Sequence, residues 1–296
     1  MKILNLAKPT YSEVEFSVSK FPDGQQDIIL RDSPLLKASL VIDEEPVEIK
    51  SRFTSFKDLE LIICATNALR RLGAKKIHLF VPYILGGRSD RQFVSGGTSY
   101  LVDVIAPILN DLEFESISTT DPHSDVTAAI IKRLEVEDNY QLMRFALTPP
   151  IYEPNTEDNF ILVSPDAGAL KKVYRVAEKI GYHGNVITCT KDRALNGTLS
   201  KVKVPYIAAD STKDLLIIDD ICDGGRTFIN IAEQARAASY TGKIYLIVTH
   251  GIFTQGFNEL AKHIDRIYTT NSYRDVSDEE WMETNKRLFV KQLNIF

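Results

Sequence analysis

The sequence predicts an α/β protein with two domains, each a mainly parallel β-sheet flanked by helices. Two observations carry this prediction. Short apolar runs with the length of buried strands recur along the chain, and segments with apolar residues at helical spacing lie between them. The chain has 296 residues, which is near the upper limit for a single hydrophobic core. In parallel sheets of this kind ligands bind at the carboxyl ends of the strands, so we expect functional residues directly after strands.

The expected elements follow from these patterns. Between Lys57 and Leu72 apolar residues recur at helical spacing, and Gly73 follows as a stop signal. A polar stretch from Thr148 to Asn159 contains three prolines and predicts the connection between a first domain, 1–147, and a second, 148–296. Apolar runs predict strands at 38–42, 77–82, 161–163, 215–218 and 244–248, and further helices are expected at 97–112, 168–180 and 227–239.

Composition excludes some classes of function. The net charge of -5 provides no general attraction to nucleic acid or to an anionic membrane, so phosphate groups must be bound by local clusters of donors. No long apolar stretch is present, and we expect neither a signal peptide nor a membrane span. Cys64, Cys189 and Cys222 lack metal-ligand spacing and resemble reduced structural thiols, which indicates a cytoplasmic protein.

The most informative segment is LLIIDDICDGGRTF, from Leu215 to Phe228. It predicts a buried strand, then Asp219 and Asp220, then a glycine loop that opens a helix. Paired carboxylates at a strand end can accept hydrogen bonds from the vicinal hydroxyls of a ribose. Backbone N–H groups at a helix N-terminus can hold a phosphate, and the residues expected to do so are Asp223, Gly224, Gly225, Arg226 and Thr227. An acidic helix cap is the alternative interpretation.

This segment resembles the phosphoribosyl diphosphate signature of type I phosphoribosyltransferases and of ribose-phosphate pyrophosphokinases. Five further segments resemble motifs of the pyrophosphokinases, in the order of that family: FPDGQQ (21–26), PYILGGRSDRQF (82–93), TTDPHSD (119–125), VSPDAGALKK (163–172) and TKDRALNG (190–197). The resemblance covers most of the chain. It implies two phosphoribosyltransferase-like domains, the first binding ATP and the second carrying the ribose and phosphate loop.

The resemblance also implies roles for single residues. In the first half, Phe21, Asp23 and Gln25 would contact the adenine of ATP bound to a neighbouring subunit, with Gln25 in place of the family's Glu. A homo-oligomer, a dimer or higher, follows from that arrangement. Arg88, Asp90 and Arg91 match the element that binds ATP, whose basic residues contact the phosphates, and the two arginines suit this role because a planar guanidinium binds phosphate oxygens bidentately.

The remaining implied roles concern magnesium and catalysis. His123 would bind the Mg²⁺ of Mg-ATP or order its phosphates, and Asp166 would contact a second Mg²⁺, for which a helix cap is the alternative role. Lys191 and Arg193 would close over the reacting phosphates as parts of a mobile catalytic loop. Diphosphoryl transfer needs charge neutralisation and alignment more than covalent help, and cationic side chains meet that need.

The expected activity is Mg-dependent transfer of the β,γ-diphosphate of ATP to the 1-hydroxyl of a 5-substituted ribose. With ribose 5-phosphate the products would be PRPP, a precursor in nucleotide biosynthesis, and AMP. The phosphate loop departs from the family pattern at Gly224 and Arg226, so ADP-ribose, giving ADP-ribose 1-pyrophosphate and a place in NAD metabolism, is an alternative acceptor. A non-catalytic regulatory homologue is a further alternative, although the catalytic-loop pair Lys191 and Arg193 is intact.

Overall fold

The computed structural model describes residues 1–148, 159–193, 199–205, 213–277, 280 and 289–296, with the side chains of 191–193 and 199–202 excepted. Two compact units result, Met1–Asp138 together with Phe296, and Asn139–Ile295. The division lies before residue 147 because helix α5 (Tyr140–Ala146) buries Leu142 and Met143 in the core of the second unit. The connection expected at 148–159 lies mostly outside the described residues.

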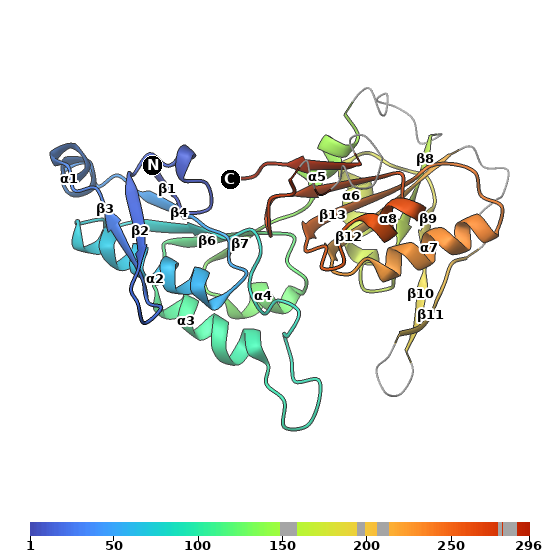
Figure 1. The fold of residues 1–296 in the computed structure, drawn as a ribbon, viewed down its shortest axis with the longest axis horizontal. Helices are drawn as coiled ribbons and strands as arrows, with labels where there is room; N and C mark the ends of the chain where they lie inside the picture. The colour runs from blue at the N-terminus through green and yellow to red at the C-terminus, as the bar shows by residue number, and fades with distance from the viewer. Residues whose placement is uncertain (149–158, 194–198, 206–212, 278–279, 281–288) are drawn as a thin grey trace. The chain divides into compact units, whose positions relative to one another are not determined.

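The first unit is built on a five-stranded parallel sheet in the order β1-β4-β5-β6-β7 (Figure 1). Its strands are β1 (Lys2–Asn5), β4 (Val47–Lys50), β5 (Ile77–Phe80), β6 (Ser116–Thr120) and β7 (Leu134–Glu137). A hairpin of β2 (Phe16–Lys20) and β3 (Gln26–Leu30) is separate from this sheet, and a 3-10 turn spans Pro9–Tyr11. The helices are α1 (Pro34–Val41), α2 (Phe56–Arg71), α3 (Ala106–Asp111) and α4 (Asp125–Ile130).

Local chemistry explains where these helices begin. The Ser55 hydroxyl accepts a hydrogen bond from the Asp58 N–H, and the Asp58 carboxylate accepts one from the Ser55 N–H, which is a capping box at the start of α2. The strand predicted over 38–42 is wrong, because those residues continue helix α1, which Ser33 caps and Pro34 opens. The helix predicted over 97–112 begins at Leu101 with a π-helical turn, Leu101–Ile105, that leads into α3.

The second unit contains a six-stranded parallel sheet in the order β15-β14-β13-β12-β8-β9. Its strands are β8 (Phe160–Ser164), β9 (Val186–Thr188), β12 (Asp214–Cys222), β13 (Ile244–Gly251), β14 (Arg266–Thr270) and β15 (Val290–Leu293). Besides α5 it contains α6 (Leu170–Lys179), α7 (Arg226–Ala237) and α8 (Asn258–His263), and β10 (Thr190–Arg193) pairs with β11 (Leu199–Lys203). Strands near 161–163, 215–218 and 244–248 and helices near 168–180 and 227–239 are thus confirmed.

The central strands of this sheet are covered on both faces. Leu215 and Ile217 belong to one apolar cluster with α7, whereas Leu216 and Ile218 belong to another with α5 and α6. Alternate residues of β12 are therefore buried on opposite faces, as expected for a parallel strand between two layers of helices.

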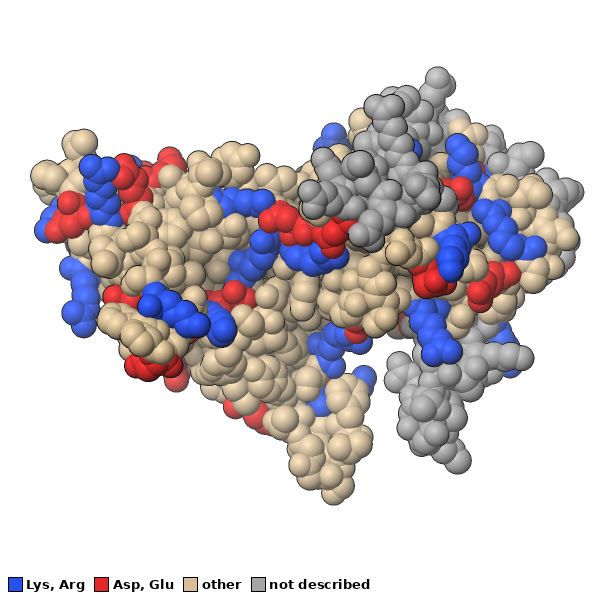
Figure 2. All heavy atoms as spheres, in the orientation of Figure 1, with Lys and Arg blue, Asp and Glu red and all other residues tan. Residues whose placement is uncertain are grey.

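The surface carries both signs of charge. On the face drawn in Figure 2, Lys and Arg side chains are interspersed with Asp and Glu. Within the described residues no helix has the length and apolarity needed to cross a membrane. The three cysteines form no disulfide, and Cys189 and Cys222 are buried.

Candidate functional site

The paired carboxylates lie on β12, beyond the point where its neighbour β8 leaves it. Strand β8 pairs with β12 only as far as Ile217, whereas β13 continues alongside to Cys222. Asp219 and Asp220 therefore lie within the strand rather than after its end, on the part that β8 no longer accompanies. Because the pairing with β8 stops at Ile217, Asp219 and Asp220 have no neighbouring strand on the β8 side of β12 within the described residues.

The environment of this pair is strongly polar and poorly hydrated. Asp220 is buried, and its Oδ2 lies 3.4 Å from Nζ of Lys172 in α6. Asp219 is half-buried, and its pKa is raised well above the ordinary aspartate value by burial first, and then by the charges of Asp220 and Asp166. The Asp220 N–H donates to Asp219 Oδ1 at 2.9 Å. Ribose hydroxyls, which donate hydrogen bonds, are suitable partners for such a pair.

Asp166 follows β8 and faces the same region, since its charge acts on Asp219. Its Oδ1 accepts a hydrogen bond from the Ala169 N–H at 3.0 Å, and its carbonyl accepts one from the Ser164 hydroxyl at 2.8 Å. The capping alternative is therefore real, because Asp166 fixes the turn that precedes α6.

The glycine loop after β12 has the geometry of an anion-binding turn. Gly225 has a φ of +79°, a conformation that favours glycine, and it directly precedes α7. The N–H groups of Gly224, Gly225, Arg226 and Thr227 donate to no acceptor among the described residues. Arg226 is exposed, and its guanidinium makes no ion pair with a described residue. Free N–H groups at a helix N-terminus and an adjacent cation together attract a phosphate.

The loop 252–254, which follows β13, is hydrogen-bonded to the residues that begin the glycine loop. The N–H groups of Ile252 and Phe253, which follow β13, donate to the Cys222 carbonyl at 2.9 and 3.1 Å. Thr254 donates to Asp223 twice, from its N–H to the carbonyl at 3.2 Å and from its hydroxyl to Oδ1 at 2.8 Å. Asp223 therefore bonds to the loop 252–254 through both its carbonyl and its side chain. The phosphate contact expected of it would use its backbone N–H.

In the first unit, the residues expected at the ATP phosphates and the metal lie on two neighbouring segments, which follow β5 and β6. The Pro82 carbonyl, after β5, accepts hydrogen bonds from the Thr119 hydroxyl and the Thr120 N–H of β6, both at 3.1 Å. Two strand ends are thereby joined, one leading to Arg88 and the other to His123. Three predicted phosphate or metal contacts, Arg88, Arg91 and His123, are exposed.

One of these residues has an alternative partner. Arg91 Nε lies 3.6 Å from Asp90 Oδ1, and its guanidinium lies 5.3 Å from the ring centroid of Phe93. Because the Arg91 side chain is 75% exposed, this pair is held weakly and can reorganise around an anion.

The residues expected at adenine form the loop of the β2–β3 hairpin. The Phe21 N–H donates to the Gln25 carbonyl at 2.8 Å, and Asp23 accepts from the Gln25 N–H at 3.2 Å. Phe21, Asp23 and Gln25 are all exposed. Lys191 and Arg193 lie on β10, but their side chains are outside the described residues, as are residues 194–197 of the same motif.

No group of three or more His, Cys, Asp and Glu within the described ranges is arranged to hold a metal ion by itself. Magnesium does not require one, since it binds one or two carboxylates and keeps waters and substrate phosphates as its other ligands. The Asp166 carboxylate, whose charge acts on the nearby Asp219, is a ligand of the type that such a site needs.

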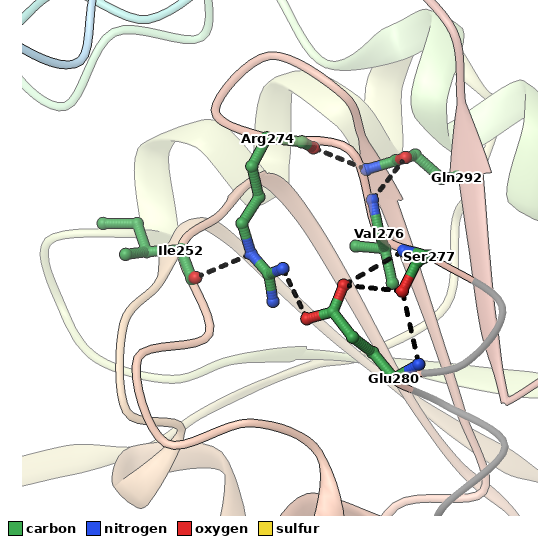
Figure 3. Close-up of polar contacts among 6 residues, drawn as sticks. All are labelled: Ile252, Arg274, Val276, Ser277, Glu280 and Gln292. Carbon is green, nitrogen blue, oxygen red and sulfur yellow. Dashed lines mark hydrogen bonds and ion pairs between the residues drawn. The ribbon is translucent and has the colours of Figure 1, made fainter.

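Sequence reasoning missed two residues that touch this site. Lys172 pairs with Asp220 from α6, and Arg274 reaches the Ile252 carbonyl from the loop after β14 (Figure 3). Both contacts join segments that are far apart in the sequence, and no local pattern indicates them.

Comparison with known proteins addresses the expected resemblance. No protein-family model matches the chain. The ribose-phosphate pyrophosphokinase of Saccharolobus solfataricus is 29% identical over 237 residues, which are 78% of this chain and 76% of that protein. That of Thermococcus kodakarensis is 26% identical over 88% of this chain and 86% of that protein. The chain is therefore related to the ribose-phosphate pyrophosphokinases. The resemblance seen in the motifs is confirmed.

The fold agrees with this relationship. The crystal structure of phosphoribosylpyrophosphate synthetase from Mycobacterium smegmatis superimposes with a TM-score of 0.75, covering 97% of this chain and 88% of that one at 16% identity. The predicted architecture of parallel sheets flanked by helices, as in ribose-phosphate pyrophosphokinases, is confirmed.

Proposed function

We propose that the chain is a Mg-dependent pyrophosphokinase that transfers the β,γ-diphosphate of ATP to the 1-hydroxyl of a 5-substituted ribose. One observation carries the proposal. Strand β12 carries the acid pair Asp219 and Asp220, and a helix-opening loop follows within five residues, whose N–H groups at 224–227 lack acceptors among the described residues. Hydroxyl recognition and phosphate recognition therefore follow one another along one strand and turn.

The acceptor is bound by the second unit. Asp219 and Asp220 accept hydrogen bonds from the 2- and 3-hydroxyls of the ribose, while residues 223–227 hold its 5-phosphate. Lys172 pairs with Asp220 and orients its carboxylate as an acceptor. A 1-hydroxyl presented from such a ring is fixed at three points, which gives the alignment that diphosphoryl transfer needs.

ATP is bound by residues of the first unit, with Arg88 and Arg91 on its phosphates. Phe21, Asp23 and Gln25 serve the adenine of a second copy in a homo-oligomer. His123 would bind the Mg²⁺ of Mg-ATP or order its phosphates, and Asp166 would bind a second Mg²⁺; both ions would neutralise phosphate charge. Lys191 and Arg193 bind the oxygens of the transferred group and stabilise the charge that develops there.

The chemistry is a single displacement. The 1-hydroxyl oxygen forms a bond to the β-phosphorus, the bond between that phosphorus and the oxygen bridging to the α-phosphate breaks, and AMP leaves with the electron pair. The proton of the 1-hydroxyl is released to solvent. No covalent enzyme intermediate is needed.

Arg226 favours ADP-ribose as a second candidate acceptor. Its exposed guanidinium stands at the phosphate loop without an ion pair to any described residue, and a diphosphate bridge carries more charge than a single phosphate. In an Arg226→Gly variant the KM for ADP-ribose should rise about tenfold or more, whereas the KM for ribose 5-phosphate should change less. Equal changes for both acceptors would remove this argument for ADP-ribose.

The test of the function is AMP release from Mg-ATP with ribose 5-phosphate and ADP-ribose offered in parallel, and Lys191→Ala as the control for contaminating enzymes. AMP that depends on an acceptor and is lost in the control supports the proposal and identifies the acceptor. No AMP with either acceptor would favour the non-catalytic regulatory homologue. The cytoplasmic setting and the homo-oligomer remain predictions.

A further inference from the structure

The loop that follows β14 is tied firmly to β15. Gln292 of β15 donates from Nε2 to the carbonyls of Thr270 and Arg274 at 3.1 and 2.9 Å, and its Oε1 accepts from the Val276 N–H at 3.1 Å. One glutamine side chain thus holds three points of a short loop, as Figure 3 shows for two of them. This places the backbone of Arg274 in a fixed position.

The side chain of Arg274 is fixed as well. Its Nη1 lies 2.6 Å from Glu280 Oε1, and its guanidinium lies 5.9 Å from the ring centroid of Phe257. Glu280 is in turn held by Ser277, whose N–H donates to Oε2 at 3.0 Å. The guanidinium therefore has one orientation, in which Nε points at the Ile252 carbonyl at 3.2 Å (Figure 3).

Ile252 connects this arginine to the proposed phosphate loop. Its carbonyl accepts from Arg274, and its N–H donates to the Cys222 carbonyl at 2.9 Å. The next residues, Phe253 and Thr254, bond to Cys222 and Asp223 as described above. A continuous set of hydrogen bonds therefore runs from Glu280 through Arg274 and residues 252–254 to the start of the loop 223–227.

We propose that Arg274 is a positioning residue for the acceptor: its guanidinium, oriented by Glu280, holds residues 252–254 in the place from which they fix the loop 223–227. The inference rests on the proposed function, in which that loop binds the 5-phosphate. Its N–H groups act on a phosphate only if they converge, so a small displacement of Cys222 or Asp223 weakens acceptor binding. Contacts to ATP lie elsewhere in the chain and are not changed.

Arg236 provides a matched control. It also donates to backbone carbonyls, those of Tyr240 at 2.9 Å and Gly242 at 2.7 Å, and it pairs with Asp265 at 3.4 Å. Its guanidinium lies 5.7 Å from the Tyr240 ring. The two arginines are similarly exposed, 37% for Arg236 and 29% for Arg274, but Arg236 lies at the end of α7 remote from the loop.

The experiment compares Arg274→Met and Arg274→Lys with Arg236→Met. For each, the KM for the acceptor, the KM for Mg-ATP, kcat and the urea midpoint are measured. We expect Arg274→Met to raise the acceptor KM about tenfold, with the KM for ATP changed less than about twofold, and Arg274→Lys to recover part of the loss. Arg236→Met should lower the urea midpoint but leave both KM values unchanged. An unchanged acceptor KM in Arg274→Met, or equal changes in both arginine variants, would overturn the proposal.

Two further measurements keep the test decisive. Glu280→Gln is the substitute if Arg274→Met does not fold, because it leaves the guanidinium in place but weakens its orientation. It should raise the acceptor KM about twofold to fivefold. No rise in that KM would overturn the proposal. Amide hydrogen exchange needs no activity. The N–H groups of Ile252, Phe253 and Thr254 are the hydrogen-bonded reporters. Faster exchange there in Arg274→Met, and not in Arg236→Met, supports the positioning role even if the proposed reaction is wrong, and unchanged exchange contradicts it.

Discussion

The replacement Gly225→Ala tests how tightly the phosphate loop is packed. Gly225 has a φ of +79°, and a Cβ built there would lie 2.8 Å from Cδ2 and 3.0 Å from Cγ of Leu260. The left-handed backbone costs an alanine about 1–2 kcal/mol. Leu260 is buried and cannot move freely, so overpacking adds about 1–3 kcal/mol. The free energy of unfolding should therefore fall by about 2–5 kcal/mol.

Gly181→Ala is the matched comparison, because Gly181 has a φ of +66° and no atom within 4 Å of its built Cβ. It should lose only the backbone cost of about 1–2 kcal/mol. Urea unfolding of both variants, followed by circular dichroism, gives the two free energies from their midpoints and slopes. The reasoning is refuted if Gly225→Ala is no less stable than Gly181→Ala. A raised acceptor KM in the Gly225 variant alone would link the packing to binding.

Two further predictions concern the acid pair Asp219 and Asp220. Because the pKa of Asp219 is raised by burial and by Asp220, the folded chain loses stability as pH rises from about 3.9, the ordinary aspartate value, through the raised pKa. Asp219→Asn should accordingly be inactive and, at pH 8, more stable than the natural chain. The urea midpoints of the two proteins are compared at pH 8 and at pH 4. A difference between them that is the same at both pH values would contradict this prediction. Lys172→Met removes the ammonium that lies 3.4 Å from the buried Asp220 carboxylate and should cost about 1–3 kcal/mol. A second replacement, Asp220→Asn, should restore most of this loss. Costs that simply add in the double variant would show that the two side chains are not coupled.

Local patterns predicted the second unit well. The apolar run from Leu215, the acid pair and the glycines were sufficient to place β12, the loop and α7, because strand burial and helix initiation are local properties. The short apolar run 38–42 fits either a strand or a helix, and the cap at Ser33 decides for the helix.

The supporting contacts of the site could not be predicted in this way. Lys172 reaches Asp220 because α6 crosses the sheet beside β12, and Arg274 reaches Ile252 because β14 pairs with β13. Each contact depends on strand order, which the sequence alone did not establish. The hydrogen bond that Asp223 accepts from Thr254 depends in the same way on the neighbouring strand, β13.

The most direct test of the account is the phosphorus-31 spectrum of a reaction that contains the protein, Mg-ATP and the acceptor that supports AMP release. Intact transfer of the diphosphate predicts that AMP and a coupled pair of diphosphate resonances on the sugar appear together and at equal rates. ADP with a phosphomonoester, or AMP with free pyrophosphate and an unchanged acceptor, would contradict the proposed chemistry.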